Sequence, residues 1–124
     1  MNFRFRRSDR LRLTREFNTV YKKGRRYSAS GIALWVYRHP EESQLGPRIG
    51  LAIPRAYGNA VQRNRLKRLL REVFRLNKSQ LFPGIDLVFS CRTLMPEAKY
   101  QTIEPVVKSL WKKANILSDS FSRP

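Results

Sequence analysis

Hydrophobic residues recur with helical spacing in three segments of the chain and follow strand patterns in three others. The helical segments are residues 14–23, 59–76 and 102–115, and the strand segments are residues 29–38, 48–53 and 85–91. Their order predicts an α+β fold, an α/β sandwich in which three helices cover a small, mainly antiparallel central sheet. The expected order is α-β-β-(β)-α-β-α, with room for one more strand before the second helix. The first two strands are expected to pair antiparallel.

The ends of the predicted helices carry recognisable signals. Thr14 is expected to cap the first helix, and Gly24 to end it in the left-handed conformation that glycine adopts without a steric penalty. Asn59 can cap the second helix, with Gln62 completing a capping box. Pro105 is tolerable only in the first turn of the third helix, because proline has no backbone N–H to donate.

Alternate side chains of the strand at residues 29–38 predict two different faces. Ile32, Leu34 and Val36 point one way and are expected in the core, whereas Trp35 and Tyr37 point the other way with Ala33. Tryptophan and tyrosine combine an apolar ring with a polar group, so two of them on one face suit a half-hydrated groove. The strand at residues 85–91 is mostly apolar, which predicts a central position in the sheet.

The length of 124 residues predicts a single domain. Residues 1–12 are interpreted as a basic extended arm, in which Phe3 and Phe5 alternate with arginines. Residues 13–115 are the expected folded core, and residues 116–124 a flexible tail. The arm has two interpretations, a frayed terminus or a segment that stacks on RNA and pairs with it.

The chain carries 26 Lys and Arg against 9 Asp and Glu, a formal net charge of +17. Repulsion among so many cations destabilises the compact state, and a polyanionic partner would remove that cost. Nucleic acid is the first candidate and an anionic membrane surface the second. No apolar run is long enough to span a membrane, and the first residues lack the apolar stretch of a secretory signal. The single cysteine and single histidine exclude an internal disulfide and a site built on paired histidines.

No group of residues predicts a catalytic site. Metal-dependent nucleases need several converging carboxylates, yet only Glu41 and Glu42 are close in sequence, and a solvated loop pair is the simpler interpretation. Asp86 opens a strand and is expected to pair with a basic neighbour. His39 is expected on a surface loop without a partner for acid–base chemistry, and Cys91 is expected to be buried. We therefore expect no catalytic residue and no metal ligand in the protein.

Cations concentrate on the second predicted helix. Its leucines share one face of a helical wheel with Val73 and Phe74, and most of the cations lie opposite or beside them. Like charges four residues apart destabilise a helix, which weakens the interpretation as a solvated face. A membrane-surface helix would need an exposed apolar face, but a small domain needs these leucines in its core. The candidate RNA-binding residues are Arg63, Asn64, Arg65, Lys67, Arg68 and Arg71.

This segment resembles the RNR signature of the protein subunit of bacterial ribonuclease P, on the residues Arg63-Asn64-Arg65-Leu66-Lys67-Arg68-Leu69-Leu70-Arg71. The flanking residues 58–61 and 73–75 fit the family as well. Upstream, residues 10–24 resemble its first helix and residues 48–51 its central strand. The resemblance extends over about residues 5–115.

The resemblance implies a function and a set of contacts. Ribonuclease P removes the 5′ leader of precursor tRNA; its RNA subunit does the chemistry with Mg²⁺, and the small protein is an accessory that is inactive alone. By similarity, the second helix would contact the RNA subunit in a 1:1 complex. A cleft between the first helix and the sheet would bind the single-stranded leader. The resemblance assigns to this cleft Phe17, Tyr21 and Trp35, with Arg10 and Arg12 as additional basic contacts.

The single cysteine and the lack of a secretory signal predict a location in the reducing cytoplasm. The resemblance implies a left-handed crossover into the last strand, where the general rule is right-handed. Two other functions stay open at this point. A structural RNA-binding protein of the ribosomal type would share the charge and the layout but would not need the aromatic cleft. A protein-only nuclease would need clustered carboxylates. For the three cleft aromatics, ordinary core packing is the alternative to stacking on bases.

Overall fold

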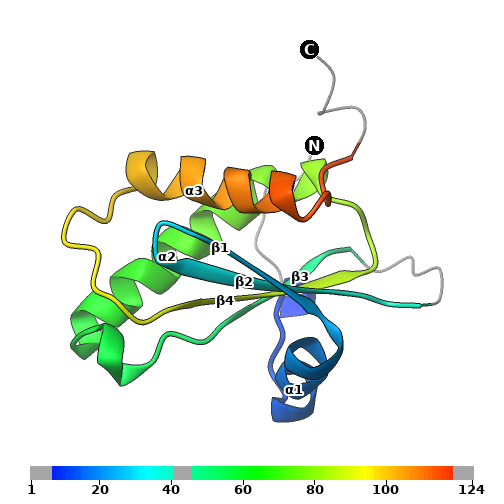
Figure 1. The fold of residues 1–124 in the computed structure, drawn as a ribbon, viewed down its shortest axis with the longest axis horizontal. Helices are drawn as coiled ribbons and strands as arrows, with labels where there is room; N and C mark the ends of the chain where they lie inside the picture. Colours follow the sequence, from blue (N-terminus) through cyan, green and yellow to red (C-terminus); the bar gives the residue numbers. More distant parts are fainter. Residues whose placement is uncertain (1–6, 41–45, 119–124) are drawn as a thin grey trace.

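The computed structural model describes residues 7–40 and 46–118, and it has the α+β architecture that the sequence predicts. Figure 1 shows the sheet with two helices on one side and one on the other. The helices of the described part are α1 (Thr14–Lys23), α2 (Ala60–Asn77) and α3 (Tyr100–Lys113). The strands are β1 (Arg25–Ala29), β2 (Ile32–Arg38), β3 (Arg48–Leu51) and β4 (Ile85–Cys91). Short 3-10 helices are η1 (Arg7–Asp9), η2 (Arg55–Tyr57) and η3 (Lys78–Gln80).

The strands lie in the order β1-β2-β4-β3. β4 pairs antiparallel with β2 and parallel with β3, and β1 pairs antiparallel with β2. The central position of β4 is confirmed. The first two predicted strands, residues 29–38 and 48–53, were expected to pair antiparallel with each other. This prediction is wrong, because β4 lies between β2 and β3. Parallel strands need a long crossover, and α2 provides it between β3 and β4. A left-handed crossover, as the family resemblance implies, stays a prediction.

The sequence left room for a third strand before α2 without assigning residues to it, and this strand is β1. The segment expected to be one strand over residues 29–38 contains the end of β1, a turn and β2. Ser30 and Gly31 have φ angles of 50° and 85°, as a two-residue hairpin turn requires. Gly24 does not adopt the predicted left-handed conformation, since its φ and ψ are −84° and 171°. Glycine is needed there for close packing: a Cβ would lie 2.5 Å from the carbonyl oxygen of Val20 and 2.7 Å from that of Val36.

The N-terminus of α1 differs from its predicted cap, although the helix has the predicted bounds. Leu13 is the N-cap residue and Thr14 is the first helical residue. One carboxylate oxygen of Glu16 accepts the backbone N–H groups of Arg12 and Leu13, both at 2.9 Å. The Glu16 side chain therefore satisfies the amides at this helix end, in place of the Thr14 hydroxyl.

The predicted capping box of α2 is confirmed. Asn59 Oδ1 accepts the Gln62 N–H and Gln62 Oε1 accepts the Asn59 N–H, both at 2.8 Å. In α3 the predicted position of proline is wrong. The helix begins at Tyr100, two residues before the predicted start, so Pro105 lies in the second turn and one helical hydrogen bond is missing.

The main core lies between the sheet and the pair α2 and α3. The predicted inward residues of β2, Ile32, Leu34 and Val36, are buried in it. A smaller cluster on the opposite face packs beneath α1 and consists of Leu11, Val20 and Val88, with half-buried side chains around it. Since one short helix covers this second face only in part, aromatic side chains there stay accessible (Figure 1).

Both chain ends contribute more to the fold than predicted. Residues 7–12 are not an extended arm: they contain η1, and Leu11 is buried and donates its N–H to the Ile49 carbonyl at 2.9 Å. Asp9 forms a 2.8 Å ion pair with Lys78. Residues 116–118 are not a free tail, because Ile116 is buried and Leu117 bridges to Leu81. Residues 1–6, with the two predicted arm phenylalanines, and residues 119–124 lie outside the described part.

Candidate RNA interface

Two of the predicted cleft aromatics are in contact on the sheet face that carries α1. The rings of Tyr21 and Trp35 meet edge to face, with centroids 5.1 Å apart and an interplanar angle of 84°. The guanidinium of Arg26, on β1, lies 5.4 Å from the centre of the Trp35 ring, within the range of a cation–π interaction. Burial raises the pKa of the Tyr21 hydroxyl, so this group keeps its proton at neutral pH.

The third predicted aromatic, Phe17, occupies a separate place one turn nearer the start of α1. Its ring lies directly on Gly50 of β3: a Cβ at Gly50 would lie 2.7 Å from two ring carbons and 3.2 Å from a methyl carbon of Leu11. Phe17 is half-buried against the small cluster that contains Leu11. The alternative of core packing therefore applies in part to Phe17, which packs with one side and is accessible on another.

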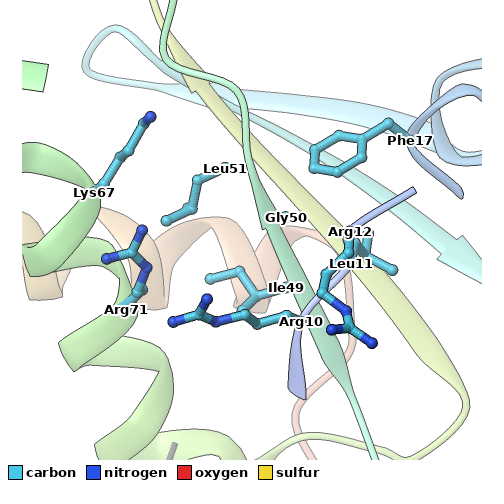
Figure 2. Close-up of a pocket in the computed structure, with 9 residues that line it drawn as sticks. All are labelled: Arg10, Leu11, Arg12, Phe17, Ile49, Gly50, Leu51, Lys67 and Arg71. Carbon is cyan, nitrogen blue, oxygen red and sulfur yellow. The ribbon is translucent and has the colours of Figure 1, made fainter. Parts of the chain in front are cut away.

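Phe17 faces a cavity of about 240 Å³ that opens to solvent beside β3. Figure 2 shows side chains of α2 on one side of β3 and Phe17 on the other. The cavity brings together residues from the N-terminal segment, α1, β3 and α2, and its lining is Arg10, Leu11, Arg12, Phe17, Ile49, Gly50, Leu51, Lys67 and Arg71. We call it the β3 cavity. It brings together Lys67 and Arg71 of the predicted helix contacts, the two additional basic contacts Arg10 and Arg12, and the predicted aromatic Phe17.

Two of the cations that line the β3 cavity, Lys67 and Arg71, come from α2. Within residues 7–40 and 46–118, neither Lys67 nor Arg71 forms a salt bridge. Burial, and next the charge of Arg10, lower the pKa of Arg71, although a guanidinium stays protonated in a protein. A phosphate group entering the cavity would relieve this repulsion and could accept paired hydrogen bonds from an arginine.

The remaining predicted residues of α2 divide into two kinds. Asn64 and Arg68 are exposed on the outer surface. Arg63 and Arg65 are tied to the protein itself: Arg63 donates to the Gly58 carbonyl at 2.7 Å, and Arg65 donates to the Ala98 carbonyl at 3.1 Å. Each of these two guanidiniums keeps further N–H groups and holds a neighbouring loop against α2.

Comparison with known proteins agrees with this layout. A family model described as ribonuclease P matches residues 5–115. The chain belongs to the ribonuclease P protein family. It is 40% identical over 109 residues to the ribonuclease P protein component of Finegoldia magna, which covers 88% of this chain and 93% of that protein. It is 36% identical over 111 residues to that of Clostridium acetobutylicum, covering 90% of this chain and 92% of the relative.

Solved ribonuclease P proteins have the same fold. The Staphylococcus aureus protein superposes with a TM-score of 0.78 at 24% identity, over 89% of this chain and 98% of that one. The Thermotoga maritima protein superposes with a TM-score of 0.73 at 29% identity, over 84% and 96%. The chain is thus a protein subunit of ribonuclease P, the endoribonuclease that processes the 5′ end of precursor tRNA, and this membership implies association with ribonuclease P RNA.

The described residues of this ribonuclease P protein do not fit a protein-held metal site. No three histidine, cysteine or carboxylate side chains among them converge as metal ligands would. The buried Asp86 is occupied instead by Arg48, whose Nε and Nη2 donate to it at 2.9 and 2.8 Å. In the same part of the chain, no helix combines the length and the apolar character needed to cross a membrane.

The same Arg48 fixes α1 on the sheet. Its Nη1 donates to Glu16 at 2.9 Å, which links β3 to the first turn of α1, and its bond to Asp86 confirms the basic partner predicted for that residue. His39 has a carboxylate partner that was not predicted, because its Nε2 lies 3.0 Å from Asp86 Oδ2. The prediction that Cys91 is buried is confirmed.

Sequence reasoning missed three residues of this interface. Arg26 was missed because the strand that carries it, β1, was not assigned from the sequence. The Ser30-Gly31 pair is a hairpin-turn signal that could have indicated this strand. Gly50 was given no role of its own, and its close contact with the Phe17 ring has no local sequence signature. Leu11 was assigned to an arm, but an apolar residue between two arginines is a signal for a buried anchor.

Proposed function

We propose that the chain binds the ribonuclease P RNA subunit through α2 and the single-stranded 5′ leader of precursor tRNA through the α1 face of the sheet. The helix contacts would be Arg63, Asn64, Arg65, Lys67, Arg68 and Arg71. The leader contacts would be Phe17, Tyr21 and Trp35, with Arg10 and Arg12 as additional basic contacts. The complex would contain one protein per RNA subunit and would act in the bacterial cytoplasm.

One observation carries this proposal: Phe17 shares the β3 cavity with Lys67 and Arg71 of α2. An aromatic face next to unneutralised cations suits a nucleotide, whose base stacks on the ring while its phosphate meets the cations. Stacking is tolerant of sequence, which suits an enzyme with many different leaders. Because the cavity joins α1 to α2, a leader bound there would lie next to the RNA subunit.

The chemistry would belong to the RNA. Mg²⁺, required by the holoenzyme on the family resemblance, would be held by RNA and substrate, since the described residues do not fit a site for it. The protein's own residues would bind and orient: Phe17 and Trp35 hold bases, cations hold phosphates, and Arg48 keeps α1 at its distance from the sheet. A leader held in this way reaches the RNA subunit already oriented, which raises the rate without a catalytic side chain.

Reconstitution tests the proposal. Protein, a bacterial ribonuclease P RNA and precursor tRNA are combined at low Mg²⁺, and cleavage is measured with and without each component. The expected result is that the protein alone cleaves nothing and that it stimulates the RNA. Stimulation should fall for Lys67→Gln/Arg71→Gln, but not for Lys99→Gln/Lys108→Gln, which removes two lysines that pair with nearby acids.

Three other results would count against this function. RNA binding without stimulation would favour a structural RNA-binding protein. Metal-dependent cleavage by RNA-free protein would favour a protein-only nuclease. Equal effects of the two double variants would mean that the β3 cavity has no special part in the complex.

A further inference from the structure

A second group of cations lies at the other edge of the sheet, where α1 leads into β1. Lys23, Arg25 and Arg38 line a cavity of about 210 Å³ together with Tyr27, Val36 and Tyr37. All three cations are exposed. We call this cavity and its lining the β1-edge surface. It lies at the opposite edge of the sheet from β3, because β1 and β3 are the two outer strands.

The β1-edge surface is not neutralised within the described part of the chain. Each acid of that part lies in a salt bridge, and none of these pairs includes Lys23, Arg25 or Arg38. Arg38 has a structural task, since its Nη2 donates to the carbonyls of Ala114 and Asn115 at 3.0 and 2.9 Å. Lys23 and Arg25 have no such task in the described structure, and their charge is available to a ligand.

The strand β1 connects this surface with the aromatic residues of the α1 face. Consecutive residues of a strand point to opposite faces. Arg26 therefore lies on the α1 face, above Trp35, while Arg25 lies on the other face and lines the β1-edge surface. Because β1 is the last strand of the sheet, one arginine flanks this edge on each side. A chain that passes Trp35 and Arg26 and crosses the edge comes next to Arg25 and Lys23.

We infer that the β1-edge surface binds the phosphodiester backbone of the upstream part of the 5′ leader, beyond the nucleotides that stack on the aromatic residues. This inference rests on the proposed leader binding and extends it to a second edge of the sheet. The occupant is a polyanionic single strand, because exposed cations without a rigid donor frame bind phosphate charge and read no base. The path runs from Phe17, which lies over β3, past Tyr21 and Trp35 at β2, to β1, and so it crosses the whole sheet.

The test uses the reconstituted holoenzyme and precursor tRNAs with leaders of about three and about ten nucleotides, which bracket the shorter site sizes of single-strand-binding grooves. The variant is Lys23→Gln/Arg25→Gln. The control is again Lys99→Gln/Lys108→Gln, which removes the same charge from the sheet face opposite α1. Dissociation constants are measured for both precursors, for mature tRNA and for the RNA subunit alone, over a range of salt concentrations.

We expect the variant to bind the long-leader precursor about two- to thirty-fold more weakly, as the loss of two exposed charge contacts implies. Its log–log salt slope for that precursor should be shallower by about 1.4, since each single-strand phosphate contact contributes about 0.7. Affinities for the short-leader precursor, mature tRNA and the RNA subunit should match wild type. The control should match wild type throughout.

An unchanged affinity for the long leader would overturn the inference, and so would equal losses for both leader lengths or a loss of RNA-subunit binding. Equal losses for both leader lengths would indicate a contact with the tRNA body, and a loss of RNA-subunit binding would indicate a contact with the RNA subunit. The proposed function has its own criterion in the same data. If wild type fails to prefer the short-leader precursor over mature tRNA, leader binding near the aromatic residues fails; if it keeps that preference, only the β1-edge inference is at stake.

Discussion

The close contact between Gly50 and Phe17 makes a specific energetic prediction. Gly50→Ala adds one carbon beneath the Phe17 ring, 2.7 Å from two ring carbons. Carbon atoms normally approach to about 3.5–4.0 Å, so the ring or the helix that carries it must move by about 1 Å. Overpacking of this size costs about 1–3 kcal/mol in the free energy of unfolding.

A second substitution separates this cause from others. In a Phe17→Ala background the ring is absent, and the next neighbour of the new carbon is a methyl carbon of Leu11 at 3.2 Å, which needs to yield by only a few tenths of an ångström. There Gly50→Ala is expected to be neutral, or stabilising by about 0.4–1 kcal/mol through the lower entropy of the unfolded chain. The coupling between the two positions should therefore be about 1–4 kcal/mol.

The coupling between Gly50 and Phe17 is measured by urea unfolding at one fixed salt concentration. The proteins compared are wild type, both single variants and the double variant. Gly46→Ala is a matched control, because a Cβ there meets nothing within 4 Å. Precursor-tRNA binding should also weaken in Gly50→Ala, since the displaced ring lines the β3 cavity. The reasoning is refuted if Gly50→Ala costs the same with and without the Phe17 ring, or if it costs no more than Gly46→Ala.

Three further changes have expected outcomes. Trp35→Ala should lower the preference of the holoenzyme for precursor over mature tRNA by about 1–3 kcal/mol, one lost base stack, in a binding titration; equal losses for both RNAs would make Trp35 a packing residue. Arg68→Ala, at an exposed position, should reduce the log–log salt slope of RNA-subunit binding by about 1 with an unchanged urea midpoint, and a lowered midpoint would assign it a structural role. The N–H of Leu13, then that of Arg12, and then Arg48 hold the pKa of Glu16 below 4.5. The ionised Glu16 therefore makes its full contribution to the free energy of unfolding above pH 4.5 and loses it as the pH falls through the lowered pKa. Glu16→Gln should lower the free energy of unfolding at pH 7, and the difference from wild type should disappear in acid. A difference that stays constant across pH would exclude this role of the charge.

The parts of the fold that local rules decide could be predicted from the sequence. The capping box of Asn59 and Gln62 involves residues three apart, and the bounds of α1 and β4 coincide with the predicted ones. The pairing of β3 with β4 rather than β2 is a tertiary choice that neither strand's own pattern contains. β1 was missed because Arg25, Arg26 and Ser28 break the apolar alternation that identifies a half-buried strand. An edge strand is often charged, and this one is.

The candidate site likewise has parts that the sequence predicts and parts that depend on contacts between distant residues. The cations of α2 were predictable because they crowd one helix. The different contacts of these cations could not be predicted. Arg65, for example, donates to the Ala98 carbonyl in the loop before α3, and this contact joins residues 33 positions apart in the chain. Likewise, the three predicted aromatics lie on the predicted face, but they occupy two places: Phe17 fills the space above Gly50, and Tyr21 contacts Trp35.

The acids of the described chain show how a protein with a net charge of +17 folds before it meets RNA. All six lie in salt bridges, and three of them hold separate elements together: Asp9 joins η1 to η3, Glu16 joins α1 to β3, and Asp86 joins β4 to β3. None of these pairs includes the exposed cations of α2 or the cations of the β1-edge surface. The acids of the fold thus leave these cations without a neutralising partner, although Arg65 and Arg38 also hold neighbouring segments through backbone carbonyls. Added salt screens the repulsion that destabilises the free protein, while it weakens phosphate binding through the counterions that binding releases. The same change in ionic strength therefore acts with opposite sign on the stability of the free protein and on its affinity for RNA.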